Sequence, residues 1–196
     1  KAPDSARYLL KAALHMKMAT PETEGNLYRD MNITDSVSVV SFEIDGVKYK
    51  RTAFISYPVQ VMVIRIEANE KQSLSFDISL KSKLLYTSEA RADDYLVLKG
   101  KAPMHVAHRP SEPEQIVYAK DEKGEGMNFE VHIKILTEGG RSTAGDSMLS
   151  VENSDVVTLI LSAATSFNGF DKYPGLEGKE PSLGAIENLE KATRTS

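Results

Sequence analysis

The stretch SFEIDGVKYKRTAFISYPVQVMVIRIEA, residues 41–68, decides the fold class of this chain. Apolar residues alternate with polar ones on both sides of Asp45-Gly46, which is the period of a half-buried β-strand. An Asp-Gly pair favours a two-residue type I′ hairpin turn, because both of its central positions need a positive φ. Tyr57-Pro58 interrupts the pattern, and residues 59–66 read as a further strand. The stretch therefore predicts antiparallel β-sheet.

The strands around this hairpin carry two finer predictions. The alternation changes phase near Val39-Val40, which predicts a β-bulge in the strand that begins at Val37. Lys48, Lys50 and Arg51 are expected on the solvent side of the return strand.

The same period recurs along the chain. Strands are predicted where apolar residues alternate or run together, at residues 74–80, 95–99, 127–135, 148–151 and 156–164. The last of these is almost continuously apolar, so it is expected to be buried on both faces or central in its sheet. Gly139-Gly140 is expected to form a turn. About ten strands joined by short turns predict an all-β, antiparallel β-sandwich.

The two ends have helical patterns. Leu10, Leu14 and Met18 recur every four residues, which predicts a helix over residues 4–18. Residues 169–181 contain repeated Gly and Pro and are expected to be an extended loop. A second helix is predicted over residues 182–193, and its apolar stripe is expected to lie on the sandwich. The stripe consists of Leu183, Ile186 and Leu189.

Composition narrows the function classes. The chain has 196 residues, a formal net charge of −4 and no cysteine. This charge gives no basic excess for nucleic-acid phosphates, so no nucleic-acid partner is expected. Cysteine chemistry is excluded, and no apolar run approaches the roughly 18 residues of a membrane-spanning helix, so no membrane partner is expected.

Histidines provide few candidates for chemistry. His105 and His108 lie in a Pro-rich stretch, where a loop does not fix the geometry of a shared metal site, and no third ligand is evident. His132 alternates with Val131 and Ile133, so it is expected on the polar, solvent-facing side of its strand. His15 carries no signal.

Acidic residues are expected in solvated turns, where no spacing selects a catalytic acid and base. The visible groups are Asp93, Asp94, Asp121, Glu122 and Glu125. GEG at 124–126 and GG at 139–140 are expected to be turns, because neither carries the Lys-Ser/Thr of a phosphate-binding loop. No catalytic, cofactor-binding or metal-binding residue is assigned.

Three segments carry a resemblance to a known family. Residues 28–68, YRDMNITDSVSVVSFEIDGVKYKRTAFISYPVQVMVIRIEA, resemble the N-terminal β-domain of glycoside hydrolase family 95, the α-L-fucosidase family. VVTLILSAATSF at 156–167 resembles its late strand, and PSLGAIENLEKATRTS at 181–196 resembles the linker toward its catalytic domain. The match extends over residues 27–196. The family's opening Leu-Gly-Asn-Gly motif is not present, which favours a truncated or unusual N-terminus.

The resemblance implies a galactose-mutarotase-like super-sandwich, truncated at its start. It implies a parent enzyme that removes α-1,2-linked L-fucose, or a related L-sugar, by inversion. In the family the acid and base lie in a later α/α-barrel domain, so no catalytic residue is carried over. It further implies docking to a linker and barrel, a glycan at the domain interface, and a periplasmic or secreted bacterial protein.

The expected domain organisation has three parts. Residues 1–26 form a helical or irregular segment, residues 27–168 form the sandwich, and residues 169–196 form a linker and helix that lead to a catalytic domain. The alternative is a free-standing carbohydrate-binding module or a surface adhesion sandwich. Two features argue against sugar binding. The chain has no Trp, and the loop aromatics are single residues (Tyr86, Tyr118 and Tyr173).

Overall fold

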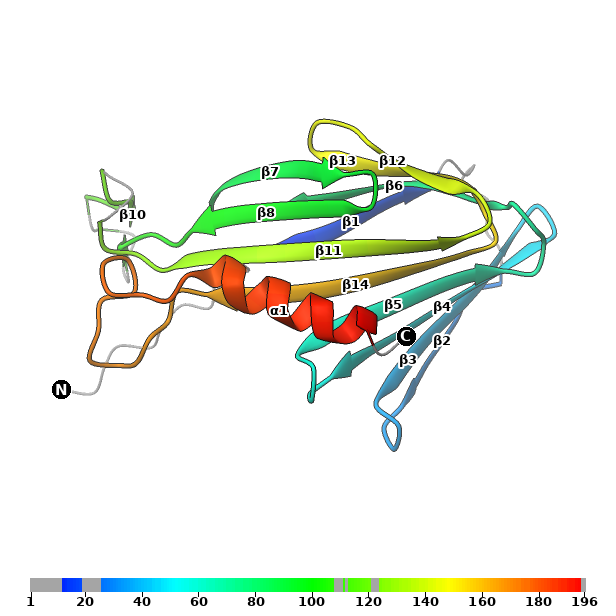
Figure 1. The fold of residues 1–196 in the computed structure, drawn as a ribbon, viewed down its shortest axis with the longest axis horizontal. Coiled ribbons are helices and arrows are strands. Elements are labelled where there is room, and N and C mark those ends of the chain that lie inside the picture. Colours follow the sequence, from blue (N-terminus) through cyan, green and yellow to red (C-terminus); the bar gives the residue numbers. More distant parts are fainter. Residues whose placement is uncertain (1–11, 19–25, 108–110, 112, 121–123, 195–196) are drawn as a thin grey trace.

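The computed structural model describes residues 12–18, 26–107, 111, 113–120 and 124–194. It is a β-sandwich whose two main sheets are antiparallel, with a single helix on the outside of the larger sheet (Figure 1). The all-β prediction is confirmed.

The larger sheet has eight strands in the order β2-β3-β4-β5-β14-β11-β8-β7. Their bounds are β2 Tyr28–Asn32, β3 Val37–Ile44, β4 Val47–Ser56, β5 Val61–Ala68, β7 Leu85–Ala92, β8 Tyr95–Lys101, β11 Asn128–Glu138 and β14 Val156–Thr165. Strand β14 lies between β5 and β11, so the prediction that this apolar segment is central in its sheet is confirmed.

The smaller sheet has four strands in the order β1-β6-β13-β12 and covers part of the inner face of the larger one (Figure 1). Its bounds are β1 Ala13–Met18, β6 Leu74–Lys81, β12 Arg141–Ala144 and β13 Met148–Ser154. A separate short hairpin pairs β9 His105–Val106 with β10 Ile116–Val117. The helix α1, Pro181–Arg194, packs on β14, β11 and β5.

Alternation builds the core between the sheets. The apolar side chains of β6 (Leu74, Phe76, Ile78, Leu80) and the odd-numbered ones of β11 (Phe129, Val131, Ile133, Ile135) point into one buried cluster. The even-numbered residues of β11 then face outward, toward α1, because successive side chains of a strand point to opposite faces. The sequence alone would place this outer face in solvent, but in the fold α1 packs on it.

Both predicted glycine turns are present. Asp45 and Gly46 have φ values of 50° and 85°, and they join Ile44 to its partner Val47 as a type I′ turn requires. Gly139 and Gly140 have φ values of 65° and 62° and turn β11 into β12.

The predicted N-terminal helix is wrong where the structure describes it. Residues 13–18 form β1, which pairs antiparallel with β6. Leu14 and Met18 pack against the core. Their spacing of four residues is also a multiple of two, so it fits one face of a strand as well as one face of a helix. Pairing with β6 decided between them; residues 1–11 lie outside the described part of the chain.

The predicted bulge in β3 is also wrong. From Val37 to Ile44 the strand pairs with β4 without a register shift, and every position is half-buried. The change of phase at Val39-Val40 reflects apolar residues on both faces of the strand. Lys48 and Lys50 are exposed as expected.

Arg51 was predicted on the solvent side with these lysines, and it is half-buried. It lies one residue beyond Lys50, so alternation turns it to the inner face. The limits of the three predicted parts of the chain stay a prediction, although β1 pairs within the sandwich.

The two hairpin glycines allow a matched test of backbone packing. An added Cβ would meet nothing within 4 Å at Gly46, but at Gly140 it would lie 2.2 Å from the carbonyl oxygen of Glu152. Gly46→Ala should cost roughly 1–2 kcal/mol of unfolding free energy for its left-handed φ. Gly140→Ala should cost about 1–3 kcal/mol more, because the backbone of β13 must shift. Urea unfolding of both variants measures this difference, and equal losses would contradict it.

Candidate functional site

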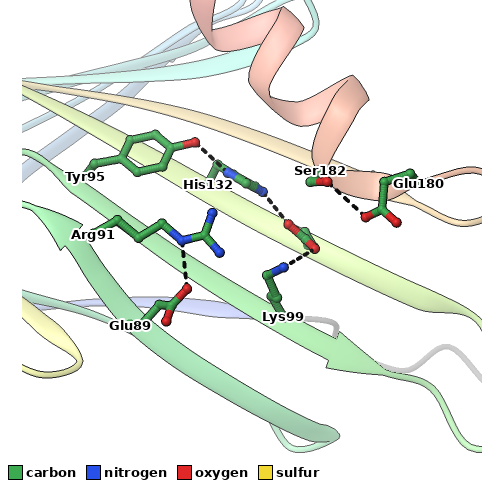
Figure 2. A network of polar contacts seen from close by, with 8 residues as sticks. Glu89, Arg91, Tyr95, Lys99, His132, Glu180 and Ser182 are labelled. Carbon is green, nitrogen blue, oxygen red and sulfur yellow. Dashed lines mark hydrogen bonds and ion pairs between the residues drawn. The ribbon is translucent and has the colours of Figure 1, made fainter. Parts of the chain in front are cut away.

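The outer face of the large sheet holds a row of polar side chains beside α1 (Figure 2). They come from the neighbouring strands β8 and β11, because the register places Glu130 opposite Lys99 and places Lys134 opposite Tyr95. His132 lies between them on β11. Alternation along β11 and pairing with β8 thus bring these groups to one face.

His132 is the centre of this row and is fully buried, with 0% of its surface exposed. Its Nδ1 lies 2.6 Å from the hydroxyl of Tyr95, and its Nε2 lies 2.7 Å from Oε2 of Glu130. The prediction of a surface histidine is wrong. The strand face was identified correctly as the polar one, but α1 covers that face.

Glu130 is the charged end of the row and is 5% exposed. Its Oε1 lies 3.1 Å from Nζ of Lys99, and its Oε2 accepts from His132. Both carboxylate oxygens therefore have partners, as a buried charge requires. At the margin, Arg91 pairs with Glu89 at 2.7 Å (Figure 2).

The protonation pattern follows from these partners. A carboxylate held by a lysine ammonium can only accept, so Nε2 of His132 carries the hydrogen and Nδ1 accepts from Tyr95. Burial lowers the pKa of His132, because the imidazolium would lose its hydration. Burial likewise raises the pKa of Tyr95 above its ordinary value. Neutral His132 and neutral Tyr95 are thus the stable forms near neutral pH.

Helix α1 is held on the same face by a small apolar cluster. Leu189 packs with Val61 and Ile160, and Tyr95 lies against this cluster. Near Leu189, the side-chain amide of Asn188 donates to Oγ of Ser162 at 3.4 Å. The helix therefore contacts the row through Tyr95 and closes the outer face over it.

The apolar stripe predicted for this helix is partly wrong. Leu189 is buried, but Leu183 is 69% exposed. The buried side is formed by Pro181, Ala185 and Leu189, which are spaced by four. Ile186 is half-buried. At 3.6 residues per turn, repeated steps of three and repeated steps of four drift in opposite directions around a helix, so Leu183 lies away from the buried side.

The Tyr95–His132–Glu130 chain has the order of a nucleophile, a base and an orienting acid. Its environment does not suit that chemistry, because the raised pKa of Tyr95 disfavours a phenolate and the base is inaccessible. Glycoside hydrolysis needs two carboxyl groups about 5–9.5 Å apart across a substrate. Glu130 is occupied on both oxygens. The arrangement can hold β8 and β11 together, and it is not built to break a bond.

A hollow of about 720 Å³ opens beside the charged end of the row. It lies between β7, β8 and the start of α1, and its lining includes Lys99, Asn128, Glu130 and Glu180. At the helix start, Ser182 donates to Oε1 of Glu180 at 2.9 Å (Figure 2).

The acidic residues considered from the sequence do not lie together in one site among the residues that the structure describes. Oδ1 of Asp93 accepts from the backbone N–H of Ala144 at 2.9 Å, and Asp94 pairs with Lys134 at 2.5 Å. Glu125 is exposed in a bend. Asp121 and Glu122 lie outside the described residues.

The histidine pair is not brought together as a site. His105 is exposed in β9, and His108 lies outside the described residues; His15 is exposed in β1. Among the residues that the structure describes, no group of three or more His, Cys, Asp and Glu could hold a metal ion. Within that same part of the chain, the helix is neither long nor apolar enough to cross a membrane.

Three comparisons with known proteins point the same way. The model of the glycosyl hydrolase family 65 N-terminal domain matches residues 1–169. A curated relative, Alpha-L-fucosidase 2 of Arabidopsis thaliana, is 29% identical over 178 residues, which is 89% of this chain and 21% of the relative. A solved structure, a putative kojibiose phosphorylase from human microbiome, aligns with a TM-score of 0.52 at 10% identity, over 96% of this chain and 26% of its own.

The helix offers a matched pair for a packing test. Leu189→Ala should cost about 2–5 kcal/mol of unfolding free energy, because Leu189 is 5% exposed and contacts β5 and β14. Leu183→Ala should change it by less than about 0.5 kcal/mol, since Leu183 points to solvent. Thermal or urea unfolding measures both, and a larger loss for Leu183→Ala would contradict this helix orientation.

His132 should make stability depend on pH. Its pKa is lowered in the folded chain, so below roughly pH 6.5 the unfolded chain binds more protons. The stability that His132 contributes is present above that pH and is lost as the pH falls toward the folded-state pKa. The slope approaches about 1.4 kcal/mol per pH unit.

The control for this pH dependence is His132→Gln, which retains one donor and one acceptor but does not titrate. Urea unfolding of both proteins between pH 8 and pH 5 should show a smaller acid-side loss for the variant. Parallel curves would show that His132 does not carry the proton.

Proposed function

Because this chain belongs to the family of glycosyl hydrolase family 65 N-terminal domains, we propose that it is the non-catalytic N-terminal sandwich of a longer glycoside hydrolase. The match of that family model over residues 1–169 carries the proposal. The chain spans about a fifth of the length of the curated relative that it matches, since 21% of that protein is covered. The remaining length of such a relative is where a separate catalytic domain has room.

The geometry favours a structural role for this domain over a catalytic one. The polar array Tyr95–His132–Glu130–Lys99 satisfies its own hydrogen bonds, and its two buried members, His132 and Glu130, lie on the face that α1 packs on. Two opposed carboxyl groups with room for a sugar are what inversion requires. Glu130 is engaged within the fold instead, so its carboxylate serves stability.

The substrate of the longer protein is proposed from its likeness to a curated α-L-fucosidase. We propose that the longer enzyme removes α-1,2-linked L-fucose, or a related L-sugar, with inversion. This agrees with the resemblance of residues 28–68 and 156–167 to the α-L-fucosidase family. A periplasmic or secreted location is proposed on the same resemblance; the curated relative that supports the fucosidase likeness is from a plant.

The partners of this domain are proposed to lie within the same polypeptide. Helix α1 packs on β14, β11 and β5 and lies along the outer face of the large sheet, where it is the last described element of the chain (Figure 1). In the proposed arrangement it is the first part of a linker, and the following domain docks beside it. A glycan at the boundary of the two domains is part of this proposal.

An assay on a fucosyl-α-1,2-galactose substrate tests the division of labour. The purified chain of residues 1–196 should release no fucose, because the part of it that the structure describes places no acid and base across a substrate. The longer polypeptide encoded by its gene should release fucose of inverted anomeric configuration, which proton NMR of the fresh product identifies.

Two outcomes would contradict the proposal. Turnover by residues 1–196 alone would place the catalytic groups in this sandwich. A gene that encodes no further domain, together with glycan binding by this chain, would instead favour the free-standing carbohydrate-binding module.

A further inference from the structure

Residues 166–179, which connect β14 to α1, form a closed loop that we call the aromatic loop. Its ends meet, because the backbone N–H of Lys179 donates to the carbonyl oxygen of Ser166 at 3.0 Å. Ser166 is tied in turn to Asn128, with backbone and hydroxyl bonds of 2.9 Å each. The loop is therefore fixed to the first residue of β11.

The interior of the aromatic loop is held by polar groups. The side-chain amide of Asn168 donates to the carbonyl oxygen of Glu177 at 2.9 Å, and the backbone N–H of Glu177 donates to the carbonyl oxygen of Tyr173 at 2.8 Å. A Cβ at Gly175 would lie 2.1 Å from the carbonyl oxygen of Gly124, so the loop packs backbone to backbone on a neighbouring turn. These contacts give the loop one defined shape.

The large apolar side chains of this loop point outward. Phe170 is 99% exposed, and three more within ten residues are more than half exposed: Phe167 at 54%, Tyr173 at 59% and Leu176 at 60%. In most surface loops polar side chains face solvent and apolar ones are buried. This loop does the opposite, because its polar groups are hydrogen-bonded inside it and its large apolar side chains are exposed. Large exposed apolar groups that gather at one site mark interaction surfaces, and these four lie within ten residues of one loop.

The chemistry of the surface favours a protein partner. Along the loop, exposed Asp171 and Lys172 lie between exposed Phe170 and Tyr173. Apolar anchors with polar groups around them are the composition of a protein–protein interface. The hairpin of β9 and β10 lies at the same end of the molecule (Figure 1) and adds exposed Ile116. Leu176 offers no flat face on which a sugar ring could stack.

We propose that the aromatic loop is the surface on which the following domain of the same polypeptide docks, with Phe170 as the central anchor. This inference rests on the proposed function, because the partner is the part of the longer enzyme beyond this N-terminal domain. Two observations select that partner: the chain covers 21% of its curated relative, and the loop runs directly into α1, the last described element of the chain. A preformed loop lowers the entropic cost of docking.

Site-specific photo-cross-linking in the longer polypeptide tests this surface. The benzophenone amino acid p-benzoylphenylalanine replaces Phe170, and in a control it replaces Lys71, which is exposed in the turn between β5 and β6. Mass spectrometry should find cross-links from position 170 to peptides beyond residue 196, and few or none from position 71. The absence of such cross-links from position 170 in an enzyme that still releases fucose would overturn the docking surface while the proposed function stands.

The variant Phe170→Ser separates docking from folding. It should leave the Tm of residues 1–196 unchanged, because the side chain is 99% exposed there, and it should lower the Tm of the longer polypeptide. An equal fall in both would overturn the inference, since Phe170 would then serve this fold alone. Glycan binding by residues 1–196 that Phe170→Ser abolishes would also overturn it. A gene without a further domain would overturn both this inference and the proposed function.

Discussion

The pairing of β11 with β14 is the constraint on which the rest of this molecule depends. The two strands run antiparallel in register from Phe129 to Glu138, and they form the middle of the eight-stranded sheet. Because both are covered on both faces, each must satisfy two environments at once. Their odd-numbered side chains fill the space between the sheets, and their even-numbered ones meet α1.

The packing of α1 on the outer face of the sheet explains the buried polar row. A strand covered on both faces can be apolar throughout, as β14 almost is, or it can carry polar groups that bond to one another. β11 does the second, and Glu130 and His132 share the face under α1 because they are two residues apart. Lys99 and Tyr95 of β8 complete the row. Removing one member would leave a buried partner without its bond, so the row holds β8 and β11 together.

The buried polar row and the exposed aromatic loop differ in what they can contact. The face under α1 holds buried His132 and Glu130, which are hydrogen-bonded within the fold, whereas the aromatic loop exposes Phe170 from a backbone that is hydrogen-bonded internally. In the proposed role, this arrangement gives rigidity inside the domain and a docking surface at the end where α1 begins (Figure 1). It also connects the two, because Ser166 and Asn128 join the loop to the start of β11.

The sequence by itself determined the all-β class, the central place of β14 and the turns at Asp45-Gly46 and Gly139-Gly140, because period-two alternation and positive φ are local properties. Tertiary structure decided what each polar face meets. His132 lies on the polar side of its strand in both views, but only the packing of α1 makes that side buried. Likewise, Leu14 and Met18 fit a helix or a strand equally well until β6 is present to pair with them. The spacing of residues shows which side chains share a face of a helix or strand. What covers that face depends on segments from elsewhere in the chain, so only the tertiary structure shows it.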